Sequence, residues 1–439
     1  MQFANPRFER IAFLGKAIGG SAGSIALRGF SIVSNIAAVS LSLQLLGPER
    51  YGQYVLLMAG ATWLALEMLG TGEYFTQILV KQPRGINDPQ VLLLVKSNFA
   101  YCTLGSVTGA AIGVIGLLIL TTIIPLDRPL VIAGLIVVIG SSTSIPLAMA
   151  SSALIAQGRI GLDAIFKLLQ PLSLLAMVTC AYLLPPISPG LMLILLSTAY
   201  VISWLITRAC AFAMTFEIKV LLRDLFKAPI GPVARGAWPF LVIQLAALLS
   251  FQTDRFLISS FSSLTELASY DLLARIFTAL YTVFSIPLLH IWRLVGASWQ
   301  TDDMPRLRRV VRLYSVGAVL FWLAATLAVV LCAPFVIELF SGSSVAALPW
   351  SVTALVGAFF LVRGTTDVLT LSLYSMGQEK RLLPFIVAHG LTNVALAAFG
   401  GMVGGIVGLL IGQVVSFILS TQMPFMIILE RLSYRDAAG

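Results

Sequence analysis

Long apolar runs, separated by short clusters of charged and turn-forming residues, make up most of this chain. Each run contains enough apolar residues to cross about 30 Å of hydrocarbon as a helix. The pattern predicts twelve membrane-spanning helices, at residues 22–46, 52–73, 91–124, 130–157, 162–184, 190–215, 238–261, 267–292, 313–340, 348–376, 382–404 and 406–429. We therefore expect an all-α polytopic membrane protein, because a helix satisfies its own backbone hydrogen bonds within lipid.

The amino-acid composition supports this class and excludes two others. Of the 439 residues, 58% are hydrophobic and 11% are charged, whereas a soluble domain has about 45–50% apolar and about 25% charged residues. A soluble globule of this composition would expose large apolar patches, and a disordered chain would contain far fewer apolar residues. All four cysteines fall in apolar segments, so we expect small buried side chains without disulfide or metal-binding spacing.

The net charge of +9 arises from basic residues that gather on alternate connections. If the N-terminus is cytoplasmic, 22 of the 28 Lys and Arg residues lie on the inner side, and only Arg50 and Arg128 lie outside. This asymmetry predicts that both termini are cytoplasmic. Because the basic residues are spread over separate loops, the distribution also excludes a nucleic-acid-binding surface.

The chain divides into two related halves. The connection at 216–237 is basic and amphipathic, which predicts a linker that lies on the membrane surface between the six-helix halves 1–215 and 238–439. The similar segments 46–54 and 262–270 occupy the same place in each half. An even number of spans in each half implies a parallel repeat about an axis along the membrane normal, and a central cavity between the halves.

Several charged residues fall inside the predicted spans, where each costs at least about 2.5–3.5 kcal/mol unless it faces the bundle interior or a wet cavity. Spacing by four residues places Asp271 with Arg275, and Arg363 with Asp367, on one helix face each. Asp254 and Arg255 are adjacent, about 100° apart around a helix, so we expect them to point at different neighbours. Two interpretations remain open, in which the pairs either neutralise each other structurally or line a transport path.

Arg28 differs from these pairs because its own segment has no acidic residue within four positions. Its guanidinium either binds phosphate oxygens of a substrate or extends towards the cytoplasmic headgroups. Glu67, in the second predicted span, is a candidate partner. The two isolated histidines predict no metal site.

Four short motifs carry a resemblance to a known family. The segment 45–54, Leu-Leu-Gly-Pro-Glu-Arg-Tyr-Gly-Gln-Tyr, resembles the loop signature of Wzx-type oligosaccharide flippases of the multidrug/oligosaccharidyl-lipid/polysaccharide exporter superfamily. The segment 254–258, followed by Tyr270, is similar to the seventh-span pattern of that family. Gly158 and Gly377 stand where the family has a glycine after spans four and ten. From the residues alone, the first segment is a tight connector between two helices, with a glycine ending one and a proline starting the next.

The resemblance implies a flippase that moves undecaprenyl-diphosphate-linked oligosaccharide units across the bacterial inner membrane by alternating access. Such units feed surface polysaccharide of the O-antigen (lipopolysaccharide) or exopolysaccharide type. Partners would be the lipid-linked oligosaccharide, membrane lipids, and also a polysaccharide polymerase and chain-length proteins, with no cofactor. Under this hypothesis the sugar-diphosphate head contacts Arg28, Arg255, Arg275 and Arg363, and the candidate ion-coupling acids are Asp254, Asp367, Asp271 and Glu67.

Two alternatives remain beside this hypothesis. A cation-coupled multidrug antiporter of the same superfamily would fit a cavity in which acids balance most of the arginines. A membrane enzyme of glycan assembly would need catalytic acids in sizeable loops, whereas the outer connections here are short and nearly uncharged. The sequence also has no Gly-x-x-x-x-Gly-Lys-Ser/Thr phosphate-binding loop, so it predicts a non-enzymatic transporter without its own ATPase.

Overall fold

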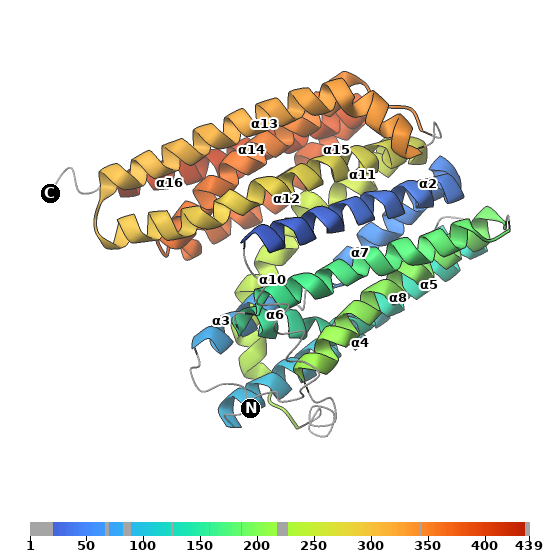
Figure 1. Ribbon diagram of the computed structural model, residues 1–439, viewed down its shortest axis with the longest axis horizontal. Helices are drawn as coiled ribbons and strands as arrows, with labels where there is room; N and C mark the ends of the chain where they lie inside the picture. Colours follow the sequence, from blue (N-terminus) through green and yellow to red (C-terminus); the bar gives the residue numbers. More distant parts are fainter. Residues whose placement is uncertain are drawn as a thin grey trace. The chain divides into compact units, whose positions relative to one another are not determined.

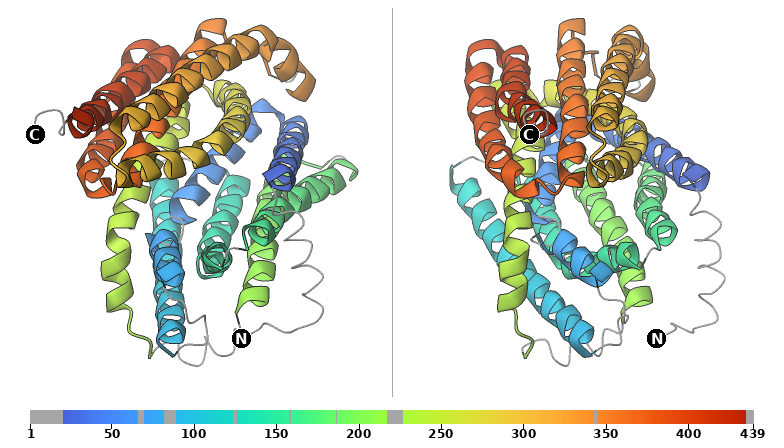
Figure 2. Two further views of the ribbon diagram at one scale, coloured as in Figure 1. Left: turned by 60° about the vertical axis from the view of Figure 1, so that its left-hand side comes forward. Right: turned by 90° about the vertical axis from the view of Figure 1, so that its left-hand side faces the viewer.

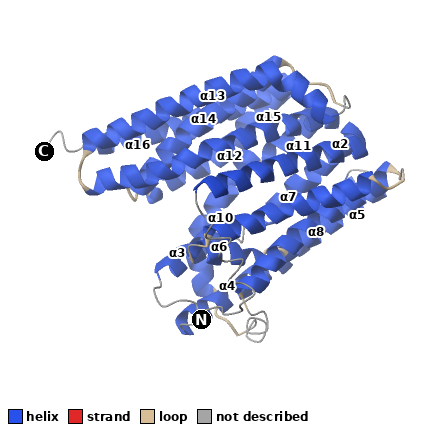
Figure 3. Cartoon of the chain, in the orientation of Figure 1, coloured by secondary structure: helices blue, strands red, loops and turns tan. Residues whose placement is uncertain are grey.

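The fold was analysed in a computed structural model of the chain. It describes residues 21–65, 70–81, 89–123, 126–157, 159–185, 187–216, 227–341 and 345–434. Every regular element in these ranges is a helix (Figure 3), as the apolar pattern predicts. The chain packs as two compact units, residues 1–244 and 245–439, which are taken in turn.

The first unit is built from long helices joined by short connections. Its elements are α2 (Ser21–Ala65), α3 (Thr71–Lys81), α4 (Pro89–Ile123), α5 (Arg128–Thr143), the 3-10 turn η2 (Pro146–Ala148), α6 (Met149–Ala156), α7 (Ile160–Tyr182), α8 (Pro189–Thr215) and the first part of α10 (Gly231–Phe251). Helix α2 packs against α5, α7 and α8, and α4 packs against α5 (Figure 1). Short α3 packs against short α6.

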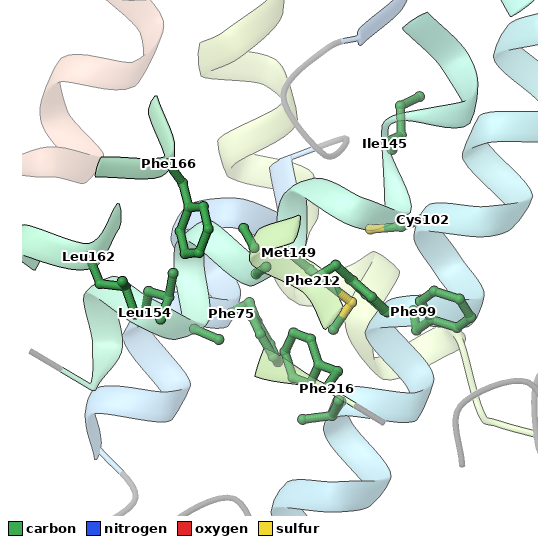
Figure 4. Packing of buried hydrophobic residues seen from close by; sticks show 14 of the residues in the cluster. Phe75, Phe99, Cys102, Ile145, Met149, Leu154, Leu162, Phe166, Phe212 and Phe216 are labelled. Carbon is green, nitrogen blue, oxygen red and sulfur yellow. The ribbon is translucent and has the colours of Figure 1, made fainter. Parts of the chain in front are cut away.

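Aromatic and aliphatic side chains fill the core of this unit at one end of its helices (Figure 4). Phe75 of α3, Phe99 of α4 and Phe212 of α8 point into the same cluster, with the ring centroids of Phe99 and Phe212 5.7 Å apart. Met149 of α6 and Phe216 complete the group. The short helices are therefore held by apolar packing against the long ones.

Two glycine breaks divide helices that are otherwise continuous. In α2, Gly47 adopts a φ of 72°, and Pro48 begins the second limb. Because a left-handed φ suits glycine and a proline suits the first turn of a helix, the motif is a helix connector, as its residues predict. The α15 helix is interrupted in the same way at Gly404 and Gly405. At both breaks only one or two glycines leave the helical conformation, so the chain bends without a long loop.

The second unit is a bundle with α14 at its centre. Its elements are the end of α10, α11 (Thr253–Phe261), α12 (Leu264–Gln300), α13 (Met304–Ser341), α14 (Trp350–Ser375), α15 (Glu379–Phe417), the π-helical turn η3 (Ile418–Gln422) and α16 (Met423–Tyr434). Helix α14 packs against α12, α13 and α15, and α11 packs against α15 (Figures 1 and 2). Helix α14 is the most buried of the candidate spans, since 67% of the residues in its most apolar stretch are buried.

The number of membrane spans agrees with the sequence pattern once the breaks are included. Nine described helices are long and apolar enough to cross a membrane, or ten with the bent pair of α5 and α6, whose axes differ by 42°. Dividing α2 and α15 at their glycines brings the described segments to the predicted twelve. Two of them start earlier than predicted, at Gly231 rather than 238 and at Met304 rather than 313. Amphipathic basic turns there continue the helix beyond its apolar part, and residues 217–226 of the predicted linker lie outside the described residues.

The expectation that all four cysteines are buried is wrong for three of them. Cys102 is buried, whereas Cys180, Cys210 and Cys332 are exposed on their helices. The outer faces of these helices carry large apolar side chains, such as Leu331 of α13. In a membrane protein the lipid-facing surface is itself apolar, so an apolar neighbourhood in the sequence does not indicate burial.

Candidate functional site

Two clusters of charged side chains lie in the second unit, and the first surrounds Asp254. Helix α10 ends at Phe251, and α11 begins at Thr253, which places Asp254 in the first turn of α11. Its Oδ1 accepts hydrogen bonds from the backbone N–H of Arg255, at 2.8 Å, and from the Arg255 guanidinium, at 3.1 Å. The Tyr270 hydroxyl donates to Oδ2 at 2.6 Å. Both carboxylate oxygens of Asp254 are therefore occupied.

Asp271 joins this cluster to the next turn of α12. Its side chain is 1% exposed; Oδ2 lies 2.6 Å from Nε of Arg275, and Oδ1 lies 3.5 Å from Nη2 of Arg255. The predicted pair of Asp271 and Arg275 is confirmed. Two acids and two bases thus form one neutral group, which we call the charge network (Asp254, Arg255, Asp271 and Arg275).

The expectation that Asp254 and Arg255 point at different neighbours is wrong, because they form an ion pair at 3.1 Å. The chain breaks at Gln252, so Asp254 lies at a helix start, where its carboxylate turns back to the free N–H groups of the first turn. The long Arg255 side chain then reaches both Asp254 and Asp271. It also donates to the backbone oxygen of Phe251, at 3.3 Å, which ties α11 to the end of α10.

Arg363 forms the second cluster and is held in a different way. It lies midway along α14, and its guanidinium carbon is 4.1 Å from the ring centroids of both Phe251 and Tyr281, and 5.8 Å from that of Phe360. We call these three rings the aromatic box. The rings come from α10, α12 and α14, so three helices contact one guanidinium.

The predicted pair of Arg363 and Asp367 is present but loose. Nε of Arg363 is 4.0 Å from Oδ2 of Asp367, whereas the Tyr281 hydroxyl donates to that same oxygen at 2.8 Å. Nε is buried and has no hydrogen-bond partner among the described residues. The side chains of Arg363 and Asp367 are 22% and 28% exposed. Of the described candidate arginines, Arg363 thus has the longest ion pair, at 4.0 Å, whereas Arg255 and Arg275 pair with carboxylates at 3.1 and 2.6 Å.

The remaining candidates are less well placed by the structure. Arg28 lies in α2, but its side chain is not among those described, and Glu67 lies outside the described residues, as does Gly158. Gly377 follows α14 with a φ of 73°, in agreement with its place after the tenth span. The proposed partnership of Arg28 with Glu67 stays a prediction.

Sequence reasoning missed the role of a half-buried arginine in the first unit. Arg208 falls within the predicted span 190–215 but was counted only among the basic residues of the inner side; in α8 its guanidinium stacks on Trp204 at 4.3 Å. Nη1 donates to the backbone oxygen of Ser144, at 3.3 Å, and to its hydroxyl, at 3.1 Å. Ser144 is the C-cap residue of α5, just before the bend into α6. The available signal in the sequence was Pro146, which interrupts an apolar run and marks the bend that Arg208 contacts.

A polar cluster around His389 in the second unit was also missed. His389 is buried, its Nδ1 lies 3.0 Å from the Ser420 hydroxyl, and its ring packs on Phe417 with centroids 4.4 Å apart. The cluster adjoins the π-helical turn at Ile418–Gln422. The spacing of serines by four residues on a helix that faces the histidine was the available signal, with Ser416 one turn before Ser420.

Comparison with known proteins relates this arrangement to a group of membrane transporters. No protein-family model matches the chain, and no curated protein sequence matches it. Among solved structures, an inward-facing multidrug resistance MATE family transporter of the MOP superfamily is similar, with a TM-score of 0.67 and 13% identity over 91% of this chain and 96% of that chain. The lipid II flippase MurJ, in an inward closed conformation, has a TM-score of 0.65 and 11% identity over 93% of this chain and 88% of that chain.

The chain has the fold of MOP superfamily transporters. A MOP superfamily transporter from Pyrococcus furiosus is similar as well, with a TM-score of 0.63 and 13% identity over 94% of this chain and 96% of that chain. At these identities the similarity concerns the fold, and the similar MOP proteins include both multidrug transporters and a lipid II flippase. The residues of the charge network and the aromatic box must therefore carry the argument about substrate.

Proposed function

We propose that the chain flips oligosaccharide units linked to undecaprenyl diphosphate across the bacterial inner membrane, by alternating access. Both termini would be cytoplasmic, and the exported units would feed surface polysaccharide. The observation that carries the proposal is Arg363, a half-buried cation in the middle of a span whose Nε has no hydrogen-bond partner among the described residues and lies 4.0 Å from the nearest carboxylate oxygen of Asp367. The MOP fold supports transport in general.

The contacts of Arg363 favour a phosphorylated ligand. Phe251 and Tyr281 each contact its guanidinium carbon at 4.1 Å, and ring contacts of this kind use none of the N–H donors of the guanidinium as hydrogen bonds. Donors arranged along one edge of a planar guanidinium match the oxygens of a phosphate group and bind them bidentately. A diphosphate head held at this edge would gain charge-assisted hydrogen bonds in a site with little water.

The other described arginines would act indirectly. Arg255 and Arg275 are paired with Asp254 and Asp271, so binding a phosphate directly would require breaking buried ion pairs. In the proposal they hold the helices that surround the site. Asp367 is the candidate coupling acid, because its closer partner is a neutral hydroxyl.

A cation-coupled multidrug antiporter is the second candidate, and the names of similar solved structures include a multidrug resistance transporter. Aromatic rings beside a carboxylate, as in the aromatic box with Asp367, favour organic cations in general. In this chain the box already holds a guanidinium, which repels a second cation. The flippase is therefore the better supported proposal.

The test is transport of a lipid-linked diphosphate by purified protein in vesicles, together with the glycan profile of a deletion strain. Deletion should remove surface polysaccharide and accumulate lipid-linked units on the cytoplasmic side. R363A should fail to restore export, and R363K should restore it in part because it keeps the charge but not the planar donors. R312Q, at an exposed arginine near the start of α13, is the control and should restore export. Normal export with R363A at wild-type protein levels would refute the assignment of Arg363, and unchanged lipid-linked pools after deletion would refute the flippase. Drug sensitivity without a glycan defect would identify the antiporter.

A further inference from the structure

The aromatic box is a cation-binding arrangement whose cation comes from the chain itself. Phe251 and Tyr281 approach the Arg363 guanidinium carbon to 4.1 Å each, and Phe360 approaches it to 5.8 Å. All three distances fall within the range of about 6 Å over which ring faces attract cations. Such attraction is strongest where water is excluded, and 22% of the Arg363 side chain is exposed.

The walls of the box are fixed by packing behind them. Phe251 contacts Phe359 and Phe417, at centroid distances of 6.2 and 6.3 Å, and Tyr281 contacts Trp322 at 6.4 Å. Trp322 is fully buried. Because side chains in such an interior relax only partly when a neighbour is truncated, removal of the guanidinium should leave a space rather than a collapsed core.

An acid stands at the edge of the same box. Oδ2 of Asp367 lies 4.0 Å from Nε of Arg363, and the Tyr281 hydroxyl donates to this oxygen at 2.8 Å. The hydrogen bond fixes the orientation of one wall relative to the carboxylate. Rings on the faces and a carboxylate at the edge are the combination that recognises quaternary ammonium and guanidinium groups.

We propose that the aromatic box of Phe251, Tyr281 and Phe360, with Asp367 at its edge, is a site for a small organic cation that Arg363 fills from within the chain. By filling it, Arg363 excludes free organic cations. Arg363 also converts the site into one that offers N–H donors to an anion, a step that rests on the proposed function above. A single side chain thereby sets the charge of the substrate that the site accepts.

Chemical rescue tests this proposal on the purified full-length protein. R363A should bind guanidinium and tetramethylammonium at least about tenfold more tightly than the wild type, a ratio typical of one desolvated cation–π contact. Binding is measured by calorimetry and by the shift of the unfolding midpoint, against sodium chloride at the same ionic strength. R363Q serves as a second variant if R363A does not fold, because its amide carbon stops two bonds short of the guanidinium carbon.

Two controls separate the box from a general effect of charge. R275Q removes an arginine that is held by Asp271, so it should gain no affinity for either cation. The double variant R363A/F251L removes one wall and should lose most of the affinity gained by R363A. Equal binding by R275Q, or no binding by folded R363A and R363Q, would overturn the proposal. Cation binding to R363A, combined with a wild type that moves no lipid diphosphate, would support the box and refute the proposed function.

Discussion

Replacing Asp271 by Asn is the most informative perturbation of the charge network. The change keeps the shape of the side chain but removes the charge that both Arg255 and Arg275 contact. Asp271 is 1% exposed, whereas the two arginines are 18% and 28% exposed. Breaking a fully buried ion pair costs about 3–5 kcal/mol, and the partial exposure of both guanidinium groups reduces that cost. We expect D271N to lower the free energy of unfolding by about 3 kcal/mol, at the low end of this range.

The distances also predict how this loss divides between the partners. Arg275 lies 2.6 Å from Asp271, whereas Arg255 lies 3.5 Å away and has Asp254 as a second partner. A double-mutant cycle of D271N with R275Q should therefore give a coupling energy of about 1–2 kcal/mol. The cycle of D271N with R255Q should give a smaller coupling energy. Each cycle compares the sum of two single losses with the loss in the double variant.

Unfolding of the purified protein in mixed micelles, titrated with a denaturing detergent, measures these free energies. Circular dichroism follows the helices, and R312Q, a change at an exposed arginine near the start of α13, is the matched control. A D271N variant within 1 kcal/mol of wild type, the scale of an exposed pair, would refute the idea that Asp271 compensates both arginines. Equal coupling in the two cycles would refute the division by distance.

Three further substitutions test other contacts, the first two by the same unfolding titration and the third by limited proteolysis. Y270F removes the hydroxyl that donates to Asp254 at 2.6 Å, and should cost about 1.5–3 kcal/mol, as for a hydrogen bond to a charged group. G364A places a Cβ against the indole of Trp322 and should cost about 1–3 kcal/mol through overpacking, whereas G317A, which meets open space, should cost less. R208M removes the donor to the C-cap of α5 and should increase protease cleavage near the bend between α5 and α6, with R128M, a change at the other end of α5, as the control. Unchanged stability of Y270F or G364A, or unchanged cleavage of R208M, would contradict the corresponding contact.

The helices were predictable because their signal is local. A span needs only an apolar stretch of sufficient length, and the glycine at position 47 followed by a proline predicts where α2 bends. The pair of Asp271 and Arg275 was predictable for the same reason, because a spacing of four residues fixes which side chains share a face. Helix ends were less accurate, since amphipathic turns at Met304 extend α13 beyond its apolar part.

The aromatic box was not predictable because it depends on which helices pack together. Phe251, Tyr281 and Phe360 lie on three helices, and the sequence gives no measure of their distance from Arg363. The ion pair of Asp254 and Arg255 was mispredicted because the angle between neighbouring positions on a helix does not show where a long arginine side chain turns to find its partners. In both cases the missing information is tertiary.

Arginine therefore serves two purposes within the second unit, and the groups that contact the guanidinium decide which purpose it serves. A guanidinium that meets carboxylates, as in Arg255 and Arg275, satisfies its donors in the plane and contributes mainly to helix packing. A guanidinium that meets aromatic rings, as in Arg363, is stabilised by the rings, and its Nε has no hydrogen-bond partner among the described residues. Face contacts thus allow a charge to reside in the middle of a span at tolerable cost without using the donors that a ligand needs. For an arginine in a membrane helix, the aromatic content of the facing helices is consequently a better guide to ligand binding than the charge alone.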